Sequence, residues 1–281
     1  MDNNELKRKL IQEVTGANVA TTPTERIVFP TEWIDLPSKG LMYPEDSPFR
    51  SGKVEMKYMT TKEEDILTSS ALIKKGVALD MYIESLVVDP AVKAALPHML
   101  LGDYDALIIA SRILGYGPEY NFRVTCPICG HSPKDGMTLD LRTLKDRVLD
   151  YDIFDKNTGV FAITLPVSKA NIQVKLFTRK DENAFKTEID ALKRLNLAIA
   201  PENSTLLKHS IVSVNGKTDT ETIRTFVDTL RGPDSLFLKR NLLQNKVGID
   251  TSFTYTCSND ECGHESELTM PTDVSFFWPG A

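Results

Sequence analysis

The fold is decided by two short cysteine-containing turns, Cys126-Pro127-Ile128-Cys129 and Cys257-Ser258-Asn259-Asp260-Glu261-Cys262. The chain has 4 cysteines in all, so these turns hold every thiol. The two spacings are typical of zinc ligands, because two thiolates on one tight turn can reach the same ion. The sequence therefore predicts one structural, tetrahedral zinc site, and its expected ligands are Cys126, Cys129, Cys257 and Cys262.

The sequence around each turn follows the same plan. An apolar and aromatic run precedes each turn, Cys-Gly-His closes it, and short alternating runs follow at 137–141 and 266–270. Alternation with a period of two indicates strands, so each turn is predicted to form the tip of a β-hairpin. Residues 130–256 lie between the pairs. The two hairpins would then form a split zinc ribbon, and one ion would tie together the two ends of a large insertion.

Disulfides or free thiols are the alternatives to metal. The first residues, Met1-Asp2-Asn3-Asn4-Glu5, are polar and acidic and do not resemble a secretion signal. We therefore expect a reducing compartment, which disfavours disulfides. His131 or His264 could replace one cysteine as a ligand. Because four sulfurs already fill a tetrahedron, we expect both histidines beside the site or facing solvent, and a closed set of four thiolates is structural rather than catalytic.

Composition narrows the function classes. A chain of 281 residues with 41% hydrophobic residues is long enough for one large domain or two small ones. No apolar run approaches the roughly 18 residues that a membrane span needs. The net charge of -6 argues against nonspecific nucleic-acid binding as the main task, since phosphate neutralisation needs clustered Lys and Arg. A zinc-ribbon nucleic-acid-binding protein stays an alternative because of the basic residues Lys169, Lys175, Arg179, Lys180, Lys186, Lys193 and Arg194.

We expect an α+β fold, with a helical N-terminal region, a split zinc-ribbon-like pair of β-hairpins and a β-hairpin and helical insertion. The predicted divisions are 1–33 (N-terminal helix and extended arm), 34–118 (strand plus helical domain), 119–142 (first half of the ribbon), 143–250 (inserted lobe) and 251–281 (second half of the ribbon and aromatic tail). The short amphipathic helix over 5–14 is too short to be stable alone in water.

Local patterns place the secondary structure. Before the first hairpin they predict a strand over 52–59, a capping box from Thr61 to Glu64, and helices over 66–75, 79–87, 91–100 and 103–114. Inside the insertion they predict strands over 160–166 and 171–177, a helix from Thr178 or Asp181 to about Leu197, a helical or mixed segment over 203–214, a tight turn at Asn215-Gly216, and helices over 220–231 and 233–246.

Side chains that could carry chemistry mostly have structural explanations. The carboxylates Asp103 and Asp105 lie at a predicted helix start, so we expect them to cap it. Arg112 is expected to pair with an acid. The aromatic tail, Phe276-Phe277-Trp278-Pro279, would either pack on the ribbon or dock into a neighbour. No catalytic serine, metalloprotease or nucleotide-loop motif is found, so the sequence predicts no enzyme.

Several motifs occur in a characteristic order, namely Leu36-Pro37-Ser38-Lys39-Gly40, Leu100-Leu101-Gly102-Asp103-Tyr104-Asp105-Ala106-Leu107, Arg112, Gly115-Tyr116-Gly117 and Cys126-Pro127-Ile128-Cys129-Gly130. Taken together this order resembles the baseplate hub proteins of T-even-like contractile-tailed bacteriophages (myoviruses). The resemblance spans about residues 34–131 and, more weakly, the later cysteine pair.

The resemblance implies a structural virion protein in the central hub, supporting baseplate assembly and tail-tube initiation. Its implied partners are other hub and spike proteins and the tape measure protein, within a symmetric multi-subunit assembly. It would be assembled in the host cytoplasm and end in the virion tail baseplate. A tail assembly chaperone that is absent from the mature virion is the alternative.

Overall fold

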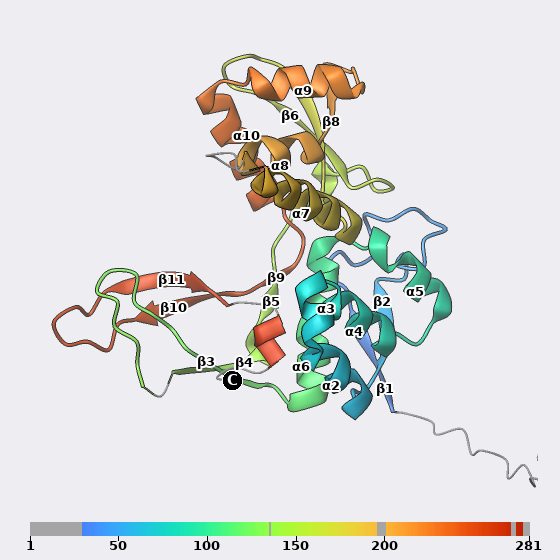
Figure 1. Cartoon of the computed structure of the whole chain (residues 1–281). Coiled ribbons are helices and arrows are strands. Elements are labelled where there is room, and N and C mark those ends of the chain that lie inside the picture. Colours follow the sequence, from blue (N-terminus) through green and yellow to red (C-terminus); the bar gives the residue numbers. More distant parts are fainter. Residues whose placement is uncertain (1–29, 135, 196–200, 271–273, 278–281) are drawn as a thin grey trace, which may run out of the picture. The chain divides into compact units, whose positions relative to one another are not determined.

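The computed structural model describes residues 30–134, 136–195, 201–270 and 274–277. It confirms a mixed α+β fold, with small antiparallel sheets and several helices (Figure 1). The chain divides at Pro30 into two units, and the features below all belong to the unit from Thr31 onward. The predicted helix over 5–14, most of the arm and Trp278-Pro279 lie outside the described residues.

A two-stranded antiparallel sheet opens the described chain. It pairs β1 (Thr31–Asp35), which the sequence patterns did not predict, with β2 (Lys53–Lys57), which confirms the strand expected there. In β2 the residues Val54 and Met56 are buried and their neighbours are not, as the alternation required. The far side of β2 also accepts a hydrogen bond, from Val88 N–H to Glu55 O at 3.0 Å, so the sheet is tied to the helices that follow.

The helices of this part run as α2 (Thr61–Thr68), α3 (Ser70–Lys75), α4 (Ala78–Leu86), α5 (Pro90–Ala95), the 3-10 turn η1 (Leu96–His98) and α6 (Leu101–Tyr116). The capping box that opens α2 lies one residue earlier than predicted. Thr60 has an extended backbone, and both its N–H and its hydroxyl donate to the Glu63 carboxylate, at 3.0 and 2.6 Å. Lys57 also binds Glu63, at 2.9 Å, and so favours this register.

Two further boundaries differ from the sequence prediction. The helix expected over 66–75 is divided at Ser69, whose ψ of 104° is extended rather than helical. Helix α6 begins at Leu101, so Gly102 and Asp103 lie inside its first turn instead of separating two helices. Leu100 has an extended backbone (ψ 140°), and its N–H is satisfied by the hydroxyl of Tyr43 at 2.9 Å.

Asp103 does not cap a helix; its carboxylate instead binds the loop between β1 and β2. Its two carboxylate oxygens accept the Ser38 main-chain N–H at 2.9 Å and the Tyr43 hydroxyl at 2.6 Å. Burial is the main reason why the pKa of the Asp103 carboxyl is raised, and it also raises the pKa of Tyr43 well above its usual range. The loop between β1 and β2 is therefore fastened to the start of α6 by polar contacts inside the core.

Arg112 also differs from its expectation. Its guanidinium donates to the main-chain carbonyls of Gly117 and Glu119, at 3.0 and 3.4 Å, and no described carboxylate lies within ion-pair distance of it. It stacks 5.0 Å from the ring of Tyr116. Gly117 ends α6 with a φ of 83°, so the chain turns sharply there, as the Gly-Tyr-Gly-Pro stretch predicted. The hydrogen bonds from Arg112 stabilise this turn.

The described part of the aromatic tail is buried. The 3-10 turn η4 (Val274–Phe277) places Phe276 against Tyr120, with ring centroids 4.8 Å apart, and Phe277 against Tyr82, at 5.0 Å. Phe276 and Phe277 are 0% and 2% exposed. The last described residues thus close the core between helix α4 and the base of the first hairpin.

The insertion contains a three-stranded antiparallel sheet in the order β6-β7-β8, followed and interrupted by helices. Its parts are β6 (Val160–Thr164), β7 (Asn171–Lys175), α7 (Arg179–Arg194), α8 (Glu202–Ser210), β8 (Ile211–Val214), α9 (Thr220–Asp228) and α10 (Gly232–Gln244). Thr178, with Asp181, caps α7, and the Asn215-Gly216 turn has the positive φ values of 50° and 80° that such a turn needs.

The two ends of the insertion are joined without any cysteine. Strand β5 (Lys145–Asp146) pairs antiparallel with β9 (Ile249–Asp250), and the Arg147 N–H donates to Gly248 O at 2.9 Å. Beside this pairing, Gly102 of α6 packs directly on the main chain, because a Cβ added there would lie 1.9 Å from Val247 O. None of the described helices is both long enough and apolar enough to cross a bilayer.

Candidate metal centre

The cysteines are carried by two antiparallel hairpins. The first pairs β3 (Glu119–Phe122) with β4 (Met137–Asp140), and the second pairs β10 (Ser252–Thr256) with β11 (Glu265–Thr269). The rings of Phe122 and Phe253 meet edge to face at 5.2 Å, one from each hairpin. This contact holds the two hairpins together below their tips, so the cysteine turns of both can face the same point.

The two turns share one pattern of main-chain hydrogen bonds. Cys126 N–H donates to His131 O at 2.8 Å, and Cys257 N–H donates to His264 O at 2.9 Å. The glycine after each pair has a positive φ, 71° at Gly130 and 53° at Gly263. A left-handed residue at this position lets the chain fold back under the sulfurs. The sequence repetition therefore corresponds to a structural repetition.

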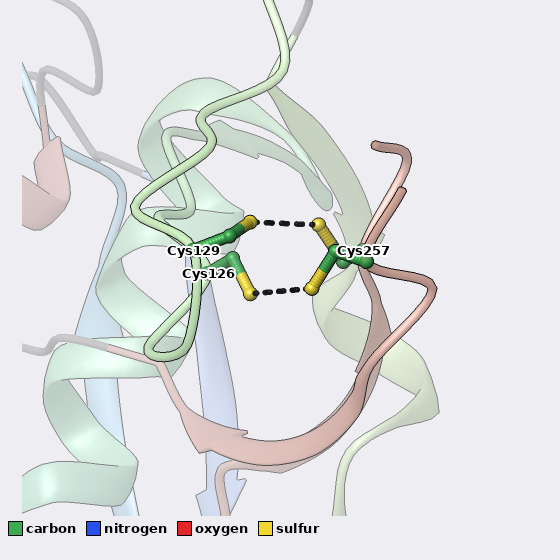
Figure 2. Close-up of side chains that lie close together, drawn as sticks. Cys126, Cys129 and Cys257 are labelled. Carbon is green, nitrogen blue, oxygen red and sulfur yellow. Dashed lines mark hydrogen bonds between the residues drawn. The ribbon is translucent and has the colours of Figure 1, made fainter. Parts of the chain in front are cut away.

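The four sulfurs converge although the pairs are far apart in the sequence. All four Sγ atoms lie within 4.8 Å of one another. Across the hairpins the Cys126–Cys262 distance is 3.9 Å and the Cys129–Cys257 distance is 3.6 Å, as the dashed lines in Figure 2 mark. Thiolates at about 2.3 Å from a tetrahedral zinc ion would lie about 3.8 Å apart. A disulfide needs about 2.05 Å, so the spacing fits a shared ion and not paired bonds.

The electrostatics of the cluster also call for a cation. The main-chain N–H groups of Cys129 and Ile128 point at the Cys126 sulfur and lower the pKa of that thiol to about 7. At Cys262 the N–H of His264 acts in the same direction, but burial and the neighbouring sulfurs outweigh it and raise the pKa to about 11. Several thiolates this close repel one another, and a divalent cation removes that cost.

The two histidines lie beside the cluster. His131 Nε2 is 3.1 Å from the Ser258 hydroxyl, so its ring connects the tips of the two hairpins. The Asn259 side-chain amide lies 3.9 Å from the Cys129 sulfur. His264 contributes its carbonyl to the turn, as noted above. Among the described residues, the four donor atoms that come together are the Sγ atoms of the cysteines.

Tyr255 was missed by the sequence reasoning. It lies two residues before Cys257, is 3% exposed, and its buried hydroxyl has no hydrogen-bond partner among the described residues. Burial, with the nearby Cys257 next in importance, raises the pKa of Tyr255. Val124 occupies the equivalent place before Cys126 and is also buried. The position two residues before each cysteine pair is thus buried in both hairpins, and this repeat is the signal that could have found Tyr255.

The fold and the site together define a mixed α+β protein built around a closed cluster of four thiols. The sequence matches the T4 bacteriophage base plate protein family over residues 34–278, and the chain belongs to this family. The matched span includes both hairpins, the insertion between them and η4. Neither the comparison with curated proteins nor the comparison with solved structures gave a match.

The family membership confirms the coarser part of the resemblance described above. The chain is a phage baseplate structural protein, and a protein of this kind works in assembly with other baseplate proteins. The Leu-Leu-Gly-Asp-Tyr-Asp stretch that contributed to the resemblance is the start of α6, where Gly102 and Asp103 make the close contacts already described.

Proposed function

We propose that the protein is a central hub component of a contractile-tail baseplate, and that it supports baseplate assembly and tail-tube initiation through protein–protein contacts. The observation that carries the proposal is the family match over residues 34–278. The expected neighbours are other hub and spike proteins and the tape measure protein, in a symmetric assembly within the virion tail.

In this proposal the four cysteines hold a structural zinc ion. The sulfur spacing and the closed donor set support the assignment, because a catalytic zinc keeps one coordination position open. The ion would fix the tips of the two hairpins relative to each other and so present a constant surface to neighbouring subunits. Metal analysis of the purified protein tests this directly: one zinc per chain is expected, and its absence from protein purified without chelators would contradict the assignment.

The hub role is tested on particles. Mass spectrometry and electron cryomicroscopy of purified virions should find the protein at the centre of the baseplate, and a phage lacking it should fail to start tail tubes. Protein that is required for assembly but missing from purified particles would support the chaperone alternative. Protein found only at the baseplate periphery would contradict the central position.

The nucleic-acid alternative has less support. The basic side chains at and near α7 are largely engaged in ion pairs: Lys175 with Asp181 (2.6 Å), Arg179 with Asp80 (2.6 Å), Lys186 with Glu182 (2.7 Å) and Lys193 with Glu202 (3.0 Å). These pairs neutralise part of the positive charge that phosphate binding would need. A salt-sensitive mobility shift with DNA at low ionic strength would favour this alternative over the hub.

A further inference from the structure

An apolar pocket of about 240 Å³ lies where the insertion meets the start of α6. Its walls come from four places in the chain: the beginning of α6, the end of β7, α8 and the last turns of α10. The apolar lining includes Leu101, Phe177, Leu206, Leu242 and Leu243. Leu243 is 63% exposed, so a large apolar side chain stands at the mouth instead of closing it.

Three lysines stand at the rim of this apolar pocket. Lys175 is committed to Asp181, at 2.6 Å. Lys239 donates to the neutral amide oxygen of Asn203 at 3.2 Å, and no carboxylate of the described residues lies within ion-pair distance of it. Lys246 lies 4.0 Å from Asp105, which is the outer limit of an ion pair. Two ammonium groups can therefore turn towards an anion at the mouth.

The basic rim is local, since the whole chain carries a net charge of -6. Apolar walls below positive charge select a ligand with the opposite arrangement, namely a large apolar group with carboxylates beside it. We propose that this pocket binds a short acidic segment of a partner protein, which inserts one leucine or phenylalanine side chain while flanking Asp or Glu residues meet Lys239 and Lys246. The proposal stands on the pocket itself and not on the hub assignment.

Binding can be measured on the full-length protein with a fluorescein-labelled hexapeptide, Glu-Asp-Phe-Leu-Asp-Glu. Fluorescence anisotropy should show saturable binding that weakens as salt is added, because the rim contacts are screened. Two control peptides separate the contributions. One replaces Phe and Leu by Ser and keeps the charge, and the other replaces the acids by Gln and keeps the apolar pair. Both should bind at least tenfold more weakly.

Variants of α10 place the binding in the pocket. Leu243→Asp and Lys239→Glu each should weaken binding about tenfold, because the first removes apolar wall and both add repulsion. Two residues of the same helix outside the pocket give matched controls: Leu236→Asp, at a side chain 47% exposed, and Arg240→Glu, at an exposed position. Both control variants should bind the peptide as the unchanged protein does.

Three results would overturn the proposal. No saturable binding of the acidic apolar peptide at millimolar concentration is one. Equal effects of pocket and control variants is another, since it would show a diffuse charge effect. Saturable binding of decanoate with no binding of the peptide is the third, because it would assign the pocket to a small amphiphile. Circular dichroism of each variant confirms that the fold is retained.

Discussion

The part of the molecule centred on α6 and the second cysteine hairpin, β10 and β11, differ in how much of their structure is buried. Around α6 the large side chains Met56, Tyr82 and Leu107 are all fully buried. In the second hairpin, by contrast, Tyr255 is the one buried strand residue of β10 and β11. A two-stranded hairpin is marginal in water unless something else fixes it. We therefore expect packing to stabilise the region around α6, and the proposed metal ion to stabilise the second hairpin.

Removing one sulfur atom is the strongest test of the difference between these two regions. Cys257→Ser should abolish zinc binding, and the loss is on the order of 10 kcal/mol of apparent binding free energy in small zinc domains. The second hairpin should then lose amide-exchange protection, while the helices around α6 keep theirs. Hydrogen exchange followed by mass spectrometry, with and without a chelator, measures both regions in one experiment.

Ser258→Ala is the matched control, because it removes the His131 contact and leaves every sulfur in place.

The same exchange experiment also measures the insertion. From the sequence alone one ion would tie its two ends together, but β5 and β9 already join them. Protection of β6 to β8 should accordingly survive the loss of metal. Collapse of the whole insertion in Cys257→Ser would show that the short pairing cannot hold alone.

Adding a single methyl group at the close contact between α6 and Val247 should destabilise the region around α6. Gly102→Ala places a Cβ 1.9 Å from Val247 O, and the obstructing atoms are main chain, which cannot rotate away. We expect destabilisation of about 3 kcal/mol or more, at the upper end for overpacked sites. Thermal and denaturant unfolding measure the change.

Gly232→Ala provides the control, since nothing lies within 4 Å of a Cβ added there and the residue is already helical. Alanine there should change the free energy of unfolding by less than about 1 kcal/mol, because its higher helix propensity is offset by the restriction that Pro233 places on the residue before it. If both substitutions had the same effect, the contact between α6 and the end of the insertion would not be the tight one described.

The polar latch on α6 should contribute less than the packing. Tyr43→Phe removes the hydroxyl that donates to Asp103 and accepts from Leu100, so two buried polar groups lose a partner. The expected cost is about 2–3 kcal/mol in urea unfolding. Tyr58→Phe is the control, because that hydroxyl bonds the exposed Glu32 at 3.2 Å and should change stability little. Equal losses would mean that the latch adds nothing beyond an ordinary surface contact.

These results bear on what the sequence could reveal. The clustering of the four cysteines was predictable because its signal is local: the spacing within each turn and the glycine after it are both in the printed sequence. The exit from α6 and the Asn215-Gly216 turn were predictable for the same reason, since glycine permits backbone angles that other residues avoid. Zinc itself stays a prediction.

Features that depend on distant partners could not be predicted. Asp103 looks like a capping residue until Ser38 and Tyr43 are brought to it from far along the chain. Strands β5 and β9 are two residues each, so neither carries a pattern of its own. The pocket lining likewise comes from four separate segments. In each case the feature is set by contacts between residues far apart in the chain, and no short stretch of sequence contains both partners.

The smallest expected effect tests the register of the capping box, where two threonines and two glutamates compete. Thr60→Ala should cost about 1 kcal/mol of unfolding free energy, and Thr61→Ala should cost close to nothing, because Thr60 is the residue that binds Glu63.

The Glu63 carboxylate should also make the effect of Thr60→Ala depend on pH. Burial opposes its charge, but Lys57 and Thr60 outweigh burial and lower its pKa. A lowered pKa contributes stability above the unfolded value of about 4.3, and this contribution is lost as pH falls through the folded value. Acid unfolding of Thr60→Ala should therefore begin at a higher pH than that of Thr61→Ala. The reverse order would favour the capping box predicted from the sequence, Thr61 with Glu64, over the observed pair of Thr60 and Glu63.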